Sequence, residues 1–168
     1  MKRFLFILTA VVLMFSFAGC DMIRVGSYNY KSSGGDWSIE IPHTYTKNKT
    51  ETDDKLKITT TTFTSKSGAE LDITEAIDPN LEFNKDTLST ELEMDTLIKV
   101  NAQYSVESKS GTIYMARAVD GITALNIIYA MTKINDKVIT ISVYQQPSFT
   151  ADEEQEVKDM VETFRKIK

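Results

Sequence analysis

The pattern of apolar and polar positions divides the chain near residue 20. From Phe4 to Phe17 the sequence is apolar apart from one threonine and one serine, whereas after residue 28 short apolar runs alternate with polar positions. The first run is shorter than the roughly 18 to 20 apolar residues that cross a bilayer. The pattern therefore predicts a secretory leader followed by a folded domain that contains strands.

Two hairpins are predicted in the first half of this domain. Over 28–42, tyrosines alternate with polar residues, Ser-Ser-Gly-Gly forms a turn, and a second alternating run ends at a proline. Over 56–77, a threonine-rich run is followed by Ser-Lys-Ser-Gly and by another alternating run. Alternation with a period of two, interrupted by turn residues, is typical of paired antiparallel strands.

A helix and three further strands are predicted in the middle of the chain. Asp86 to Ile98 contains helix formers with two leucines one turn apart. The pairs Asp120-Gly121 and Asn135-Asp136 are typical of two-residue hairpin turns, so the strands around them should be antiparallel neighbours. These strands are expected over 104–119, with a break near 109–111, over 122–133 and over 138–145.

The clearest helix is predicted at the carboxyl end. Thr150 and Glu153 have the spacing of a capping box, and Lys166 and Lys168 would close the helix favourably. Its apolar residues fall within an arc of about 120° and should dock on the sheet; they are Val157, Met160, Val161, Phe164 and Ile167. Hairpins and a few helices together indicate an α+β fold with an antiparallel β-sheet flanked by helices.

The only cysteine of the chain lies directly after the apolar run. Lys2 and Arg3 precede the run, and the small residues Ala18 and Gly19 come before Cys20. The segment resembles the bacterial lipobox, although phenylalanine stands at the position where leucine is usual. We expect residues 1–19 to be a lipoprotein signal peptide, Cys20 to be the lipid attachment site, and 20–27 to be a short tether.

Removal of the leader would leave 149 residues (168 minus 19), which suits a single domain over 28–168. Its basic and acidic residues would give a net charge of −7 (17 minus 24). An acidic surface disfavours nucleic acid and anionic headgroups as partners. With its cysteine acylated, the mature chain would form no internal disulfide and would depend on its core.

Several segments resemble the PsbP-like family, which includes DcrB-like bacterial lipoproteins. They are the stretch 35–42 with sequence Gly-Asp-Trp-Ser-Ile-Glu-Ile-Pro, the mid-chain helix, and 160–164 with sequence Met-Val-Glu-Thr-Phe. The family has a large aromatic residue soon after the proline, which Tyr45 matches in part. The resemblance implies an α/β/α sandwich with an antiparallel sheet over 28–168, and a role in binding or assembly without chemistry of its own.

The sequence contains no catalytic, cofactor-binding or metal-binding constellation. His43 is the only histidine, so neither a triad nor a zinc site is predicted. The acids of 152–156 lack the ligand spacing of a calcium loop and suit the start of a helix. No nucleophile elbow or phosphate loop occurs. A pair of carboxylates hidden among the 24 acidic residues would leave no sequence motif, so glycan hydrolysis stays open.

The aromatic residues near the amino end are candidates for contact with a partner. Trp37 suits the core better, whereas Tyr45 is expected to be the more exposed of the two. We expect a membrane-anchored, non-enzymatic binding or assembly module on the extracytoplasmic side, facing the cell exterior or the periplasm. Its partners would be membrane lipid and an unknown envelope protein. The alternatives are a cell-envelope glycan hydrolase with paired carboxylates and a surface lipoprotein that excludes phage.

Overall fold

The computed structural model describes residues 26–93 and 97–167, which form ten strands and two helices. The predicted leader, Cys20 and most of the predicted tether lie outside these residues. A small sheet has the strand order β1-β2-β10, and a large one has the order β3-β4-β5-β9-β8-β7-β6. All neighbouring strands pair antiparallel. The α+β prediction holds in part, because strands outweigh helices.

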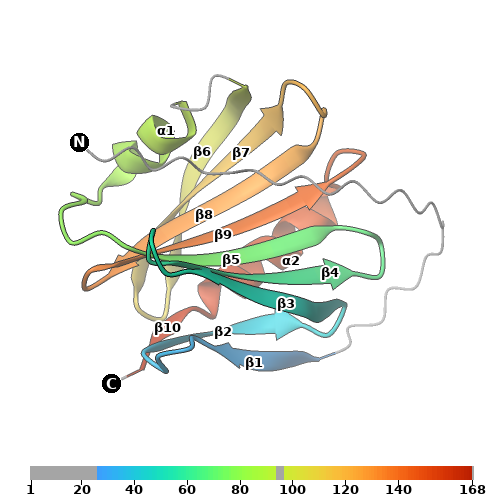
Figure 1. Ribbon diagram of the computed structural model, residues 1–168. Helices are drawn as coiled ribbons and strands as arrows, with labels where there is room; N and C mark the ends of the chain where they lie inside the picture. The colour runs from blue at the N-terminus through green and yellow to red at the C-terminus, as the bar shows by residue number, and fades with distance from the viewer. Residues whose placement is uncertain (1–25, 94–96, 168) are drawn as a thin grey trace.

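The bounds of the elements are as follows in chain order (Figure 1). They are β1 (Ser27–Lys31), β2 (Trp37–Pro42), β3 (Tyr45–Asp53), β4 (Ile58–Ser65), β5 (Glu70–Ile77), α1 (Lys85–Glu93), β6 (Ile98–Ser108), β7 (Gly111–Asp120), β8 (Asn126–Ile134), β9 (Lys137–Gln145), α2 (Ala151–Glu162) and β10 (Arg165–Lys166).

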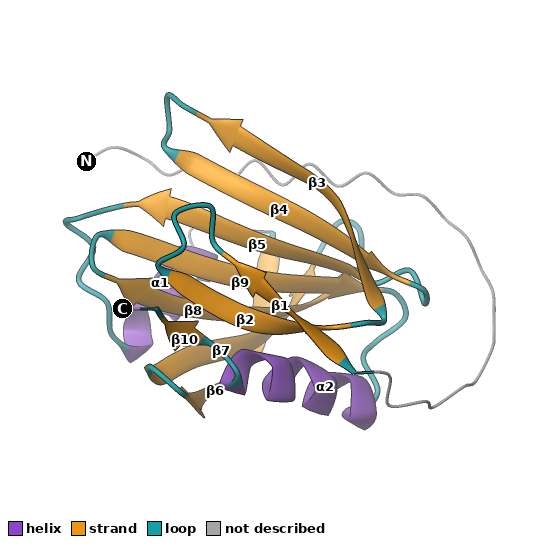
Figure 2. Cartoon of the chain, turned by 90° about the horizontal axis from the view of Figure 1, so that it is seen from below, coloured by secondary structure: helices purple, strands orange, loops and turns teal. Residues whose placement is uncertain are grey.

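The two faces of the large sheet are covered differently. On one face, the small sheet and α2 enclose the main core, which contains Trp37, Phe63, Ile141 and Phe164 (Figure 2). On the other face, α1 packs over β6 and β7 and closes a second core around Leu88. The strand residues of this second core come from β6 to β9. Among the described helices, α1 packs on β6 and β7 and not on the same face of β3, β4 and β5.

The two predicted amino-terminal hairpins are confirmed. In β1–β2, Tyr30 lies opposite Ile39 and the turn contains Gly35 with φ of 69°. In β4–β5, the turn contains Gly68 with φ of 90°. A positive φ costs glycine little, which explains why these turns need it. The predicted turn at Asn135-Asp136 is also present, with Asn135 at φ of 54°.

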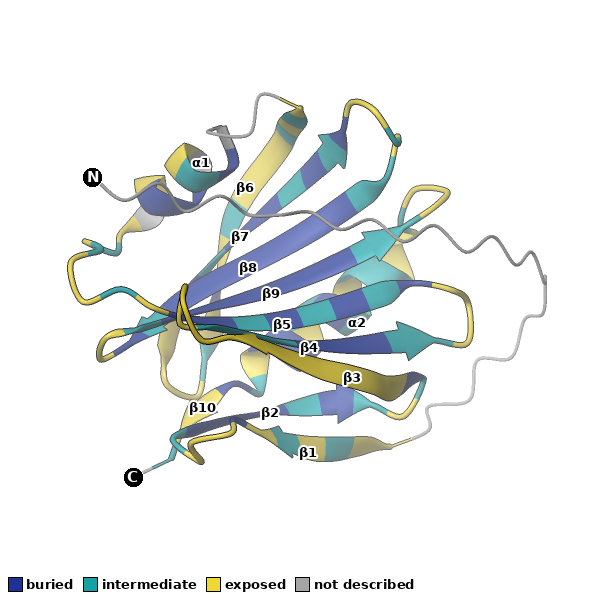
Figure 3. Ribbon diagram, viewed as in Figure 1, coloured by how far each residue is buried: buried dark blue, intermediate teal, exposed yellow. Residues whose placement is uncertain are grey.

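The sequence analysis missed strand β3. Its residues after Tyr45 are all exposed, so no apolar alternation marks it (Figure 3). It is held as the edge strand by backbone pairing with β4 and by hydroxyl contacts, Thr50 Oγ1 to Thr61 Oγ1 at 3.0 Å and Thr52 Oγ1 to Thr59 Oγ1 at 3.2 Å. β-Branched residues favour the extended backbone even where they bury little.

Three predicted boundaries were wrong. The mid-chain helix was predicted to reach Ile98 but ends at Glu93. The next strand, β6, was predicted to begin at residue 104 but begins at Ile98. The turn after Asp120 is longer than two residues, because the carboxylate of Asp120 accepts the backbone N–H groups of Ile122 and Thr123 and holds a wider loop. Such side-chain bonds to the backbone compete with a tight hairpin turn.

The capping box of the last helix is confirmed. The Thr150 hydroxyl accepts the N–H of Glu153, and the Glu153 carboxylate accepts the N–H of Thr150. The helix ends at Glu162, so the expectation that it continues to Lys168 was wrong. Phe164 then stacks on Trp37 with ring centroids 5.4 Å apart. The chain continues as β10, whose pairing with β2 is incompatible with further helix.

Candidate functional site

Strand β5 carries acidic residues on both of its faces. Leu71, Ile73 and Glu75 point toward the small sheet, whereas Glu70 and Asp72 point the opposite way. Successive side chains of a strand alternate between faces, so one short segment supplies two separate polar clusters. They differ in how their charges are balanced, and this difference identifies the candidate site.

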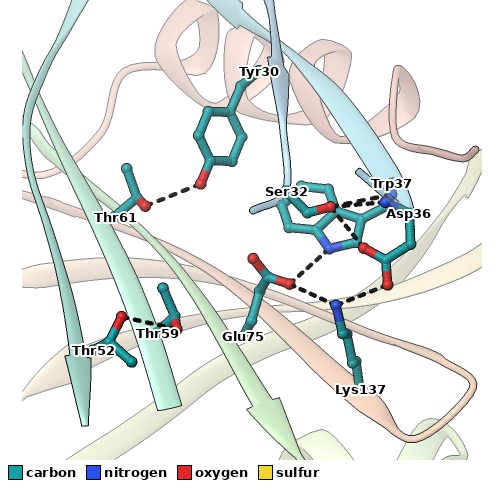
Figure 4. Close-up of polar contacts among 9 residues, drawn as sticks. All are labelled: Tyr30, Ser32, Asp36, Trp37, Thr52, Thr59, Thr61, Glu75 and Lys137. Atoms are coloured by element: carbon teal, nitrogen blue, oxygen red, sulfur yellow. Dashed lines mark hydrogen bonds and ion pairs between the residues drawn. The ribbon is translucent and has the colours of Figure 1, made fainter. Parts of the chain in front are cut away.

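The first cluster, here called the junction, joins the small sheet to the large one (Figure 4). Its members are Tyr30, Ser32, Asp36, Trp37, Thr61, Glu75 and Lys137. The Trp37 indole N–H donates to Glu75 Oε2 at 3.2 Å, and Lys137 Nζ lies 3.5 Å from the same oxygen. Lys137 Nζ also lies 2.8 Å from Asp36 Oδ2. One ammonium group therefore bridges two carboxylates from different sheets.

The turn between β1 and β2 positions this network. The Ser32 hydroxyl donates to Asp36 Oδ1 at 2.6 Å and accepts the backbone N–H of Asp36 at 3.0 Å. Nearby, the Tyr30 hydroxyl donates to Thr61 Oγ1 at 3.0 Å. The turn is thereby tied to β9 through Lys137, and β1 is tied to β4.

The electrostatics of the junction favour the charged forms of Asp36 and Lys137. Burial raises the pKa of Asp36, but hydrogen bonds from Lys137 and Ser32 outweigh burial and hold this pKa below its ordinary value. Burial lowers the pKa of Lys137, but its bonds to Asp36 and Glu75 outweigh burial and hold this pKa above its ordinary value. The junction is thus an ion-paired network in which one lysine serves two carboxylates, and its role is structural.

The second cluster, here called the open face, lies on the opposite side of β3, β4 and β5. Its members are Lys49, Glu51, Thr60, Thr62, Glu70, Asp72 and Thr74. Hydroxyl groups line it: Thr60 Oγ1 lies 3.1 Å from Thr74 Oγ1, and the Thr62 hydroxyl donates to Asp72 Oδ1 at 2.7 Å. The open face is therefore a polar sheet surface with charged groups on both β3 and β5.

A β-bulge decides which lysine belongs to the open face. Lys47 lies opposite Phe63 and places Nζ 6.0 Å from the Tyr30 ring centre, on the junction side. Lys49 lies opposite Thr62, on the open face, because the register shifts between the two lysines. Two residues two positions apart would share a face in a regular strand, but the extra residue of a bulge reverses this.

The charges of the open face are not balanced. Burial raises the pKa of Glu70, and the neighbouring carboxylate of Asp72 adds to this effect. Burial also raises the pKa of Asp72, with the smallest contribution from Glu51, and the hydrogen bond from Thr62 opposes this shift only in part. Lys49 opposes both shifts, but its ammonium group is ion-paired with Glu51 at 3.1 Å. Within 26–93 and 97–167, neither Glu70 nor Asp72 forms an ion pair.

The structure places the two predicted contact residues in the core. Trp37 is 0% exposed, and Tyr45 is 7% exposed and packs in the main core. The expectation that Tyr45 is exposed was wrong: it opens β3 on the covered side of the sheet, where burial raises its phenol pKa. The sequence analysis passed over Glu70 and Asp72, although the inward alternation of Leu71 and Ile73 carried the signal that these acids face outward.

Other features lie away from the open face. A cavity of about 250 Å³ lies near α1 and is lined by Leu88, Gln103, Tyr104, Ser105, Tyr114 and Met115. His43 is exposed beside Tyr28. Within the described part of the chain, no three acidic, histidine or cysteine side chains are grouped to hold a metal ion. No described helix has the length and apolar character of a membrane span.

Comparison with known proteins supports the fold alone. The sequence matches no known protein family and no curated protein. The structure is similar to the solution structure of cyanobacterial PsbP (CyanoP) from Synechocystis sp. PCC 6803, with a TM-score of 0.58 and 10% sequence identity. The similarity covers 89% of this chain and 98% of that chain. The expected PsbP-like fold is therefore confirmed at the level of architecture.

Proposed function

We propose that this protein is a DcrB-like lipoprotein, anchored through acylated Cys20 on the extracytoplasmic side of a membrane. In this proposal it acts as a non-enzymatic binding or assembly module, and the open face is the surface that contacts its envelope partner. The observation that carries the proposal is the pair Glu70 and Asp72, which are half-buried on a sheet face that no described helix packs against and which form no ion pair among the described residues.

The contrast with the junction supports this assignment. The carboxylates of Asp36 and Glu75 already have donors within the protein, so they hold the two sheets together. Glu70 and Asp72 stand in surroundings that disfavour their charged forms, which lowers the stability of the isolated protein. Groups kept in such a state are more common at functional sites than elsewhere.

The two lysines of β3 allow a matched cross-linking test. A photo-reactive amino acid replaces Lys49 on the open face or Lys47 on the junction side, in the full chain expressed in its own cells. After irradiation, we expect one discrete cross-linked species from position 49 and none from position 47. The absence of a cross-link from 49, or equal cross-linking from both positions, contradicts the proposal.

The anchor is tested separately by mass spectrometry. We expect the protein purified from membranes to begin at Cys20 and to carry diacylglycerol, and Cys20→Ser to release it into the soluble fraction. Recovery of an unmodified Cys20, or membrane retention of the serine variant, contradicts the anchor and leaves the open face to be judged by cross-linking.

Glycan hydrolysis is a second candidate, favoured by one observation. Glu70 and Asp72 are neighbouring carboxylates on one sheet face, and two carboxyl groups are the minimum for glycoside cleavage. The test is release of soluble fragments from purified cell-wall glycan by the full chain. We expect no release by either the native protein or Glu70→Gln. Release by the native protein alone would establish the hydrolase.

A further inference from the structure

We infer that the open face docks an extended protein segment that carries arginine or lysine side chains at alternate positions. This inference rests on the proposed function and names the chemistry of the partner. It is argued from the charges of the open face, from their spacing and from the hydroxyl groups between them.

The charge balance of the open face requires a basic partner. Three carboxylates, Glu51, Glu70 and Asp72, stand against the single ammonium group of Lys49. Lys49 Nζ lies 3.1 Å from Glu51 Oε2, so the cation that the described residues place on this surface is already engaged at the exposed edge. Opposite charges across an interface attract the correct partner, whereas a like-charged one is repelled. An anionic polymer or lipid headgroup is therefore the wrong occupant.

The spacing of the two unpaired acids matches an extended segment. Glu70 and Asp72 are two residues apart on β5, which corresponds to about 7 Å along a strand. Alternate side chains of an extended partner segment point to one side with the same repeat. Two basic side chains at alternate positions would therefore reach both carboxylates at once, whereas adjacent basic residues would point to opposite sides.

The hydroxyl groups favour a polar, hydrogen-bonded contact between the acids. The Thr62 hydroxyl donates to Asp72 Oδ1, and no described residue donates to Asp72 Oδ2. Thr60 and Thr74 bond to each other and can each accept a further donor. An arginine guanidinium presents several donors in one plane and bonds carboxylates in two places, so it suits this surface best.

The experiment measures fluorescence anisotropy of dye-labelled peptides with the full chain in neutral detergent at low salt. One peptide has the sequence Ser-Arg-Ser-Arg-Ser and the other Ser-Ser-Arg-Arg-Ser. The variant Glu70→Gln/Asp72→Asn removes two charges from the open face. The control Glu107→Gln/Asp136→Asn removes two charges from exposed positions elsewhere.

We expect the native protein and the control to bind the alternating peptide more tightly than the other. We expect the open-face variant to bind it about tenfold more weakly. Equal binding of both peptides, or equal loss in the two variants, means attraction to net charge only and overturns the inference. If the cross-link from position 49 forms but the peptides show no preference for the alternating sequence, the proposed function stands and only the inferred chemistry of the partner is wrong.

Discussion

The junction and the open face are two polar regions built on the same strand, and they use carboxylates in opposite ways. At the junction, Glu75 meets an indole N–H and an ammonium group, and Asp36 shares that ammonium. On the open face, Glu70 and Asp72 sit side by side with no ion pair among the described residues. Composition alone would treat the three acids of β5 as equivalent.

This difference separates groups that stabilise the fold from groups to which we assign recognition in the proposed function. A buried charge with its partners in place resists removal, because loss of one partner leaves the other unpaired. A half-buried charge without an ion pair costs the isolated protein free energy, and a cation supplied from outside the chain would offset this cost. Mutations in the two regions should therefore change stability in opposite directions, which makes the comparison testable.

The largest effect is expected at Trp37. Trp37→Ala removes a fully buried ring from the main core together with the hydrogen bond to Glu75. The loss should be about 4 kcal/mol of unfolding free energy, measured by chemical denaturation. Trp37→Phe keeps a ring and loses only the N–H, so it should cost less than half as much. Equal losses would show that the indole N–H decides the effect and packing does not.

Lys137→Met tests the bridge between the two sheets. It leaves Asp36 and Glu75 without their shared cation, and we expect a loss of about 2 kcal/mol, reduced from the fully buried case because the lysine is partly exposed. Lys55→Met, an exposed lysine in the turn after β3, should change the unfolding free energy by less than about 0.5 kcal/mol. A loss of similar size in both variants would contradict the structural role assigned to the junction.

Asp36→Asn tests how the stability that the junction contributes depends on pH. The pKa of Asp36 lies below its ordinary value of 3.8, so its carboxylate stabilises the folded state above pH 3.8, and this contribution is lost as pH falls through the folded pKa. We expect the variant to be about 1 kcal/mol less stable than the native protein at neutral pH. Chemical denaturation at decreasing pH should show that the unfolding free energies of the variant and the native protein converge below pH 3.8. A difference that stays constant with pH would contradict the assignment.

Glu70→Gln/Asp72→Asn should have the smallest effect and the opposite sign. The pKa values of both groups are raised, so their charges cost stability at neutral pH, and the cost vanishes below their ordinary values of 4.5 and 3.8. We expect the melting temperature at neutral pH to rise by about 1–3 °C, with no gain in acid. Glu107→Gln/Asp136→Asn should leave it unchanged. A fall in melting temperature would show that the acids are structural.

Sequence reasoning predicted the elements that have an apolar face. The hairpins β1–β2 and β4–β5 and the capped start of α2 could be predicted because alternation and capping residues are local signals. β3 could not, since an exposed edge strand held by hydroxyl pairs has no apolar period. The end of α2 depended on a distant contact, the stacking of Phe164 on Trp37.

The candidate site was less accessible to sequence reasoning than the fold. Tyr45 was predicted to be more exposed than Trp37, but its face of β3 is covered by the small sheet and α2. In the sequence, Glu70 and Asp72 are only one of many pairs of nearby acidic residues. The register of β4, β5 and β9 is needed to show which residues lie beside them. The face on which Lys49 lies could not be predicted, because alternation with a period of two does not reveal the bulge before it.

In the membrane-anchored state that we propose, the bulge in β3 has a consequence for crowding. β3 ends the large sheet and is exposed after Tyr45, so its outer backbone groups, which no described strand pairs, resemble a template on which a neighbouring copy could add a strand. Proteins held in a two-dimensional layer meet one another at high local concentration. The irregular register, with a lysine on each side of it, makes this edge a poor surface for polymerisation, so we expect anchored copies to stay dispersed at high density.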